Sequence, residues 1–150
     1  IRDRYHSVYC GLKAIKGADY VLIHDGARPF LDEEIIKRNI QAVREYQACV
    51  AGMPVKDTIK ISDEEEFAAA TPDRSKLWMI QTPQTFSYAL IYEAYEEMLK
   101  TEDAAITDDA MVLERIKGKK SKLIEGSYRN IKITTPEDLL IANVYLQHPE

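Results

Sequence analysis

Short apolar runs alternate along this chain with segments whose apolar residues recur at helical spacing. Residues 20–23, Tyr-Val-Leu-Ile, are a run of β-prone side chains, as expected for a strand buried on both faces. Residues 33–46 carry apolar side chains three and four positions apart, and Asp32 is placed to cap a helix there. Further buried strands are predicted at residues 48–55 and 77–80.

The rest of the chain continues this alternation. Helices are predicted at about residues 3–16, 87–100, 107–118 and from 135 onward, a short strand at 122–124 and an extended segment at 128–133. Residues 81–84, Gln-Thr-Pro-Gln, are interpreted as the polar exit of the preceding strand. The last helix is expected to be buried through Leu139, Leu140, Val144 and Leu146. Strands that alternate with helices predict an α/β fold with a mostly parallel sheet.

One region departs from this pattern. Residues 57–62 alternate as a half-exposed strand would, residues 63–66 are a charged turn, and residues 67–71 can return as a second strand. An isolated hairpin is marginal in water, so we expect this one to lean on a partner subunit. The alternative is an acidic surface loop without regular structure.

Composition narrows the class of protein. The 150 residues make one domain or part of one, and the net charge of -5, with no basic stripe, argues against a nucleic-acid partner. No apolar run approaches the ~18 residues of a membrane span, and we expect no signal peptide. Cys10 and Cys49 match no metal or redox spacing and are interpreted as reduced core residues, which points to the cytoplasm.

Polar clusters occur where the predicted strands end. The clusters are Asp25 with Arg28; Lys56, Asp57 and Thr58; Thr82 with Gln84; and Asn130 with Lys132, while Arg4 and Ser7 open the first helix. Cations beside hydroxyls and one or two acids are the groups that hold phosphates. The spacing of Asp25 and Arg28 fits a phosphate and its metal, and fits equally a solvated turn in which the two side chains pair.

Other titratable residues fit structural roles. His6, His24 and His148 are isolated in the sequence and are interpreted as structural. Asp108 and Asp109 are interpreted as charges that cap a helix start, with Thr107 as the N-cap residue, in preference to metal ligands.

Seven short motifs carry a resemblance to a known family. They are Arg4-x-x-Ser7-Val8-x-x-Gly11-Leu12, His24-Asp25-Gly26-Ala27-Arg28-Pro29, Pro54-Val55-Lys56-Asp57-Thr58, Asp73-Arg74-x-x-Leu77-Trp78, Gln81-Thr82-Pro83-Gln84, Thr107-Asp108-Asp109-Ala110 and the segment from Asn130 to Leu139. Each is weak alone, but the ordered set resembles 2-C-methyl-D-erythritol 4-phosphate cytidylyltransferase and its near relative, ribitol-5-phosphate cytidylyltransferase.

The resemblance implies an architecture. The chain would be the C-terminal part of a single Rossmann-like nucleotidyltransferase domain, covering residues 1–150, with a β-hairpin arm at about residues 56–76 that joins two copies into a homodimer. The family's N-terminal third, with its Gly-rich loop for CTP, has no counterpart in this sequence. We therefore expect the sheet to be incomplete at the N-terminus and the fragment alone to be inactive.

The resemblance also implies a reaction and a role for each matching residue. The phosphate of methylerythritol phosphate attacks the α-phosphorus of CTP, and pyrophosphate leaves. Lys132, and Arg74 from the partner subunit, would be catalytic. Asp25, Arg28, Thr58 and Thr82 would hold the substrate, Arg4 and Ser7 would lie at the cytidine, and Asp25 would sit near Mg²⁺.

Two readings compete with this function. The ribitol-5-phosphate enzyme performs the same chemistry on a different polyol. A non-catalytic, dimeric sugar-phosphate-binding fragment would keep the arm and the substrate side alone. The two proposed catalytic residues also have purely structural interpretations. Arg74 would be a surface ion-pair partner, and Lys132 would be a solvated strand residue.

Overall fold

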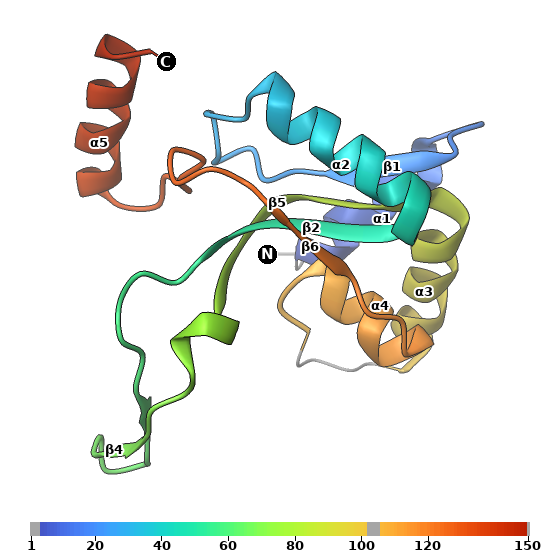
Figure 1. Cartoon of the computed structure of the whole chain (residues 1–150). Helices are drawn as coiled ribbons and strands as arrows, with labels where there is room; N and C mark the ends of the chain where they lie inside the picture. The colour runs from blue at the N-terminus through green and yellow to red at the C-terminus, as the bar shows by residue number, and fades with distance from the viewer. Residues whose placement is uncertain (1–3, 102–105, 150) are drawn as a thin grey trace.

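A mixed four-stranded sheet forms the centre of the protein, in a computed structural model that describes residues 4–101 and 106–149 (Figure 1). The strands lie in the order β1 (Tyr20–Ile23), β5 (Trp78–Ser87), β2 (Ala48–Pro54) and β6 (Lys122–Glu125). β5 runs antiparallel to both of its neighbours, and β6 is parallel to β2. The α/β class is therefore confirmed. β1, β2 and β6 share one direction, as predicted, but β5 opposes them.

The reversed direction of β5 follows from its connection. β2 and β5 are consecutive strands of this sheet, joined only by the projecting arm, and they pair with each other. A chain that leaves a strand and returns beside it runs antiparallel to it, whereas parallel neighbours need a crossover.

Helices cover both faces of the sheet. α1 (Arg4–Ala14), α3 (Tyr88–Thr101) and α4 (Asp109–Lys117) contribute to the main core, which includes Ala48 and Val50 of β2. α2 (Glu33–Tyr46) packs on the opposite face, where Cys49 of the same strand meets Val43. Because successive side chains of a strand point to opposite faces, β2 is buried on both.

The helix starts follow ordinary capping chemistry. The carboxylate of Asp32 accepts from the N–H of Ile35 at 2.7 Å, as predicted for α2. Thr135 caps α5 (Pro136–Gln147) in a reciprocal capping box with Asp138. At α4, the N-cap is Asp108 and not the predicted Thr107, because the Asp108 carboxylate accepts from the N–H of Met111 at 2.8 Å.

Two predictions about strands and extended segments differ from the structure. Residues 81–84 are not a polar exit, because β5 continues through them to Ser87, and they are buried in the sheet. Residues 128–133, predicted as an extended segment, do not pair into the sheet; they contain a turn at residues 128–129 followed by backbone without regular secondary structure. In both segments the polar side chains did not indicate the local structure correctly, because polar groups of one segment form hydrogen bonds with those of the other.

The last helix is not buried as predicted. Leu140 is 68% and Leu146 69% exposed, Leu139 and Val144 are also exposed, and Ala142 alone of its described residues is buried. α5 stands apart from the sheet (Figure 1) and meets the rest of the chain through Tyr145, whose ring packs edge-on against Phe30. The apolar side chains of α5 show that the helix could be buried, but not whether this chain covers it.

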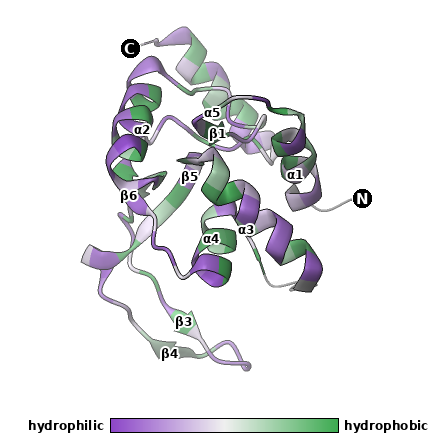
Figure 2. Ribbon diagram, turned by 90° about the vertical axis from the view of Figure 1, so that its right-hand side faces the viewer, coloured by the Kyte–Doolittle hydropathy of each residue, from purple (hydrophilic) through white to green (hydrophobic). Residues whose placement is uncertain are grey.

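The predicted hairpin is present as a projecting arm. β3 (Ile61–Ser62) pairs antiparallel with β4 (Ala68–Ala70), and residues 56–71 are all exposed. Figure 2 shows the arm extending away from the helices and the sheet. A single 3₁₀ turn, η1 (Arg74–Lys76), leads back into β5. Among the described residues, no helix combines the length and apolarity that crossing a bilayer requires.

Candidate functional site

A pocket of about 180 Å³ opens at one end of the sheet, where four segments meet. These are the loop after β1, the middle of β5, the start of α4 and the turn-rich segment after β6. Its lining residues are Asp25, Arg28, Ile80, Gln81, Thr82, Gln84, Thr107, Asp108 and Lys132. Four of them, Asp25, Arg28, Thr82 and Lys132, are residues that the sequence analysis assigned to a single site.

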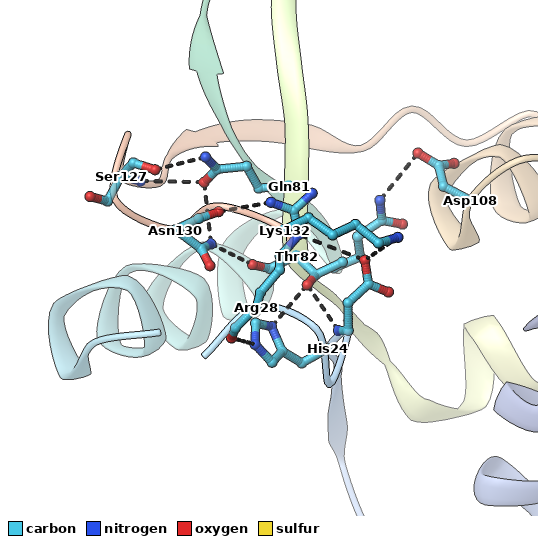
Figure 3. Close-up of polar contacts among 10 residues, drawn as sticks. His24, Arg28, Gln81, Thr82, Asp108, Ser127, Asn130 and Lys132 are labelled. Atoms are coloured by element: carbon cyan, nitrogen blue, oxygen red, sulfur yellow. Dashed lines mark hydrogen bonds and ion pairs between the residues drawn. The ribbon is translucent and has the colours of Figure 1, made fainter. Parts of the chain in front are cut away.

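Two cations converge on one carboxylate in this pocket (Figure 3). Lys132 Nζ lies 3.1 Å and Arg28 Nε 3.6 Å from Asp25 Oδ2. The side chains of Asp25 and Arg28 are 15% and 12% exposed, whereas that of Lys132 is 45% exposed. Burial lowers the pKa of the Arg28 guanidinium, and Asp25 opposes that shift. The three groups together carry one net positive charge, which suits an anion.

The loop after β1 holds Asp25 and Arg28 through its backbone. The N–H of Arg28 donates to the Asp25 carbonyl at 3.0 Å, closing a turn. The N–H of Asp25 donates to Thr82 Oγ1 at 3.0 Å, which ties the loop to β5. The N–H of Ile133 donates to the Ala27 carbonyl at 2.8 Å, which ties it to the segment that carries Lys132.

An irregularity in β5 brings Thr82 to the pocket. Val50 lies opposite Gln84 and Gly52 lies opposite Ile80, so one residue of β2 faces three residues of β5, Gln81 to Pro83. A bulge of this kind bends a strand and redirects its side chains, and bulges are common beside active sites.

Buried amides connect the pocket to the segment after β6. Asn130 Nδ2 donates to Gln81 Oε1 at 3.2 Å and to the Thr82 carbonyl at 2.8 Å (Figure 3). The Asn130 carbonyl accepts from Arg28 Nη1 at 2.8 Å. Gln81 also donates to the Ser127 carbonyl at 2.7 Å. Because these groups are buried and engage one another, the network holds Arg28 in place.

Asp108 forms the facing wall of the pocket. Its Oδ2 accepts from Gln84 Nε2 at 3.1 Å, while its Oδ1 caps α4. Gln84 Oε1 in turn accepts from the N–H of Ala110 at 2.9 Å. The role at the helix start that the sequence analysis gave Asp108 is therefore confirmed. The sequence analysis did not predict that Asp108 and Thr107 line the same pocket.

His24, which the sequence analysis interpreted as structural, has both ring nitrogens within hydrogen-bond distance of other groups. Its Nδ1 lies 2.9 Å from Thr82 Oγ1 and its Nε2 lies 2.9 Å from the Arg28 carbonyl. The sequence carried one signal for this position, since His24 directly precedes Asp25. Its two partners, at positions 28 and 82, become visible only in the fold.

The remaining predicted site residues lie elsewhere. Thr58 and Arg74 are exposed on the arm, and Arg74 Nη1 donates to the Lys56 carbonyl at 2.7 Å. Ser7 is exposed on α1 and does not line the pocket. The side chain of Arg4 lies outside the described part of the chain.

The described residues contain no group of three or more His, Cys, Asp or Glu side chains that could hold a metal ion. Asp25 is placed to offer a carboxylate, but its Oδ2 is already paired with Lys132. Mg²⁺ in enzymes is often bound by one or two carboxylates together with substrate phosphates. The donor set therefore fits a cation that arrives with a phosphate ligand, and does not fit a cation held by the protein alone.

Comparison with known proteins identifies the family. The profile described as IspD: 2-C-methyl-D-erythritol 4-phosphate cytidylyltransferase matches residues 2–148. The chain belongs to this cytidylyltransferase family. The resemblance inferred from the ordered motifs is thereby confirmed.

Individual relatives agree with this family. The 2-C-methyl-D-erythritol 4-phosphate cytidylyltransferase of Alkaliphilus oremlandii is 52% identical over 97% of this chain and 61% of its own length. That of Lachnospira eligens is 50% identical over 97% of this chain and 65% of its own length. The crystal structure of 4-diphosphocytidyl-2C-methyl-D-erythritol synthase from Anaerococcus prevotii superposes with a TM-score of 0.91 at 41% identity, covering 99% of this chain and 66% of that one. The chain thus spans 61% to 65% of the length of these two curated cytidylyltransferases.

Proposed function

We propose that this protein serves the transfer of CMP from CTP to 2-C-methyl-D-erythritol 4-phosphate, a step in isoprenoid precursor biosynthesis, and that the pocket binds the phosphorylated polyol. The observation that carries the proposal is the convergence of Arg28 and Lys132, from segments far apart in the sequence, on Asp25 at the mouth of one pocket. Membership of the cytidylyltransferase family supports the same reaction.

The proposed reaction depends more on bound cations and on the positions of the two substrates than on a general base. The second pKa of a phosphate monoester is near ~6, so the attacking oxygen is already anionic at neutral pH. That oxygen forms a bond to the α-phosphorus of CTP, the bond from this phosphorus to the bridging oxygen breaks, and pyrophosphate leaves. The main obstacle is the repulsion between two polyanions, which fixed cations reduce by holding the substrate phosphate in place.

Each pocket residue has a role in this proposal. Lys132 contacts the phosphate of the polyol, because its side chain is the most exposed of the three charged side chains Asp25, Arg28 and Lys132. Arg28 is more deeply set and keeps the phosphate side of the pocket positive. Asp25 orients Lys132, and together with the phosphates of the substrates it is the residue that would hold Mg²⁺.

The arm belongs to the proposal as the part that joins two copies. Its exposed residues include Thr58 and Arg74, which in a homodimer would reach the pocket of the other subunit. The apolar exposed side chains Ile59, Ile61 and Phe67 support contact with a protein surface.

CTP binding is the part of the proposal with least support inside this chain. Arg4 and Ser7 are the proposed contacts to cytidine. The six glycines are scattered singly, so the sequence contains no glycine-rich loop for a triphosphate. We therefore expect the 150-residue chain by itself to bind methylerythritol phosphate without transferring CMP. A cytoplasmic location is part of the same proposal, and the free thiols of Cys10 and Cys49 support it.

The test compares the complete gene product with the 150-residue chain. Pyrophosphate release is measured with CTP and methylerythritol phosphate together and with each alone, and calorimetry measures binding of each. Release by the complete protein only when both substrates are present supports the function. Binding of neither substrate by the complete protein would refute it.

The two rival functions give different results when ribitol 5-phosphate is added to the same experiment as a competing substrate and the products are identified. A ribitol-5-phosphate enzyme would form CDP-ribitol in preference to CDP-methylerythritol, although the relatives compared above are methylerythritol enzymes. A non-catalytic binding protein would take up the sugar phosphate, but the complete protein would release no pyrophosphate.

A further inference from the structure

The ring of His24 joins the loop that carries Asp25 and Arg28 to the bulge of β5. Nδ1 lies 2.9 Å from Thr82 Oγ1, and Nε2 lies 2.9 Å from the carbonyl of Arg28 (Figure 3). Thr82 Oγ1 also accepts from the N–H of Asp25 at 3.0 Å. We use the name latch for four groups: His24, Thr82, the N–H of Asp25 and the carbonyl of Arg28.

The partners of His24 determine which atoms carry hydrogen. A carbonyl oxygen can only accept, so Nε2 must carry the proton that it donates to the Arg28 carbonyl. In the neutral ring Nδ1 is then an acceptor, and the hydroxyl of Thr82 must donate to it. That hydroxyl has one proton, which this bond uses, while its oxygen accepts from Asp25.

This assignment limits what Thr82 can do for a substrate. Phosphate oxygens at neutral pH accept hydrogen bonds, so a residue that binds them must donate. Thr82 lines the pocket, but its proton points to His24 and not to the ligand. A direct bond from Thr82 to a phosphate would require breaking the bond to His24.

The two ends of the latch act on the cationic site. One end holds the N–H of Asp25 and the other holds the carbonyl of Arg28, so together they fix the turn between these residues. The side chains of that turn form the ion pair to which Lys132 is added from another segment. A change in the latch would therefore move Asp25 and Arg28 together.

We propose that His24 is a positioning residue of the sugar-phosphate site, and that it acts through Thr82 and the Arg28 carbonyl. Thr82 then contributes as the middle of the latch and not as a phosphate ligand. This inference rests on the proposed function for its substrate, methylerythritol phosphate.

Two substitutions in the complete gene product remove the bond between His24 and Thr82 from either side. His24→Gln keeps a donor near the position of Nε2 and loses the link to Thr82. Thr82→Val keeps the shape of the side chain and removes the hydroxyl, while Thr82→Ser retains it. His148→Gln is the matched control, because His148 is exposed at the end of α5, away from the pocket residues.

We expect Thr82→Val and His24→Gln each to raise the KM for methylerythritol phosphate about tenfold, with the KM for CTP and the melting temperature changed little. Thr82→Ser should restore the wild-type KM. The double variant should be no worse than Thr82→Val alone, because both changes remove the same bond. If Thr82 instead donates to the phosphate while His24 only supports the fold, the two effects will multiply, and the proposal is overturned.

A spectroscopic measurement tests the latch without activity. Nitrogen NMR of the histidine rings should show His24 with hydrogen on Nε2 and none on Nδ1, and Thr82→Val should shift the Nδ1 signal. Hydrogen on Nδ1 of the neutral ring would overturn the latch even in an active enzyme. Conversely, the expected tautomer in a protein that transfers no CMP would support the latch and reject the function.

Discussion

At the scale of single residues, the chemistry of the pocket depends on which donors and acceptors are already engaged. Asp25 is paired with Lys132 and Arg28, so its charge serves to organise cations. In the proposed latch, the proton of the Thr82 hydroxyl is directed at His24 Nδ1. Lys132 is the most exposed charged group around Asp25, and it is therefore the group on which binding of an anion should depend most.

Replacing Lys132 tests this dependence. In the complete protein, Lys132→Gln should lower kcat/KM for methylerythritol phosphate by roughly tenfold to a hundredfold, because a hydrogen bond to a charged group contributes about 1.5–3 kcal/mol. Lys37→Gln is the control, since Lys37 pairs with Glu33 on the exposed face of α2. Steady-state kinetics with each substrate varied in turn measures the effect. Equal kinetics for both variants would contradict the assignment.

The two cysteines should differ in reactivity. Burial raises the pKa of the Cys49 thiol from 9.0 to about 12, whereas Cys10 is exposed and is not the core residue that was predicted. The neutral thiol is inert, so at pH 8 iodoacetamide should label Cys10 in the folded protein and both residues after unfolding. Mass spectrometry of the labelled peptides measures this.

The same shift gives a dependence of stability on pH. The raised pKa favours the protonated thiol in the folded state, so the contribution of Cys49 is complete below its unfolded pKa and is lost as the pH rises toward about 12. Labelling of Cys49 as fast as Cys10 at pH 8 would contradict its burial.

At the scale of elements, the site depends on irregular pieces and not on the regular ones. The bulge in β5 brings Thr82 to the pocket, and the turns after β6 supply Asn130 and Lys132. Gly126 lies where these two pieces touch, and a Cβ built there would fall 2.3 Å from Gln81 Oε1. A side chain at position 126 would therefore require the Gln81 amide to move.

A methyl group at this position tests that contact. Gly126→Ala should destabilise the fold by about 1–3 kcal/mol, because the buried Gln81 amide must move away from Ser127 and Asn130. Gly11→Ala is the control, since a Cβ on Gly11 meets nothing within 4 Å and alanine suits helix α1. Urea unfolding measures both variants. Equal stability of the two would show that Gln81 gives way freely.

At the scale of the whole molecule, two features extend beyond the packed sheet. The arm carries its strands into solvent, and α5 presents the exposed side chains of Leu139, Leu140, Val144 and Leu146. Apolar surface of this kind is uncommon on a protein that works as a single copy. In the proposed homodimer, the arm is the part that joins the two copies.

Replacing the arm separates folding from assembly. In the complete protein, a short Gly-Ser turn in place of residues 61–70 should leave the melting temperature nearly unchanged, because these residues are exposed. The same variant should become monomeric and lose CMP transfer, since Arg74 and Thr58 would no longer reach a second pocket. Light scattering after size-exclusion chromatography measures the mass. A dimer that survives this change would reject the role of the arm.

Local patterns in the sequence were enough to predict most elements and several pocket residues. The strand at residues 20–23, the Asp32 and Thr135 caps and the hairpin depend on side chains within a few positions of one another, and all are present. The ordered motifs were sufficient for the family. They also marked Asp25, Arg28, Thr82 and Lys132, which the fold brings to one pocket.

Only the tertiary structure decided how distant segments use one another. Polar residues 81–84 lie within a strand because partners from the turns after β6 and from α4 satisfy their buried amides. His24 meets Thr82, 58 positions away, only in the folded chain. Most apolar side chains of α5 are exposed because the rest of this chain does not pack over them. A local sequence pattern shows which secondary structure a segment prefers. Burial and hydrogen bonding depend instead on which distant residues the folded chain places beside it.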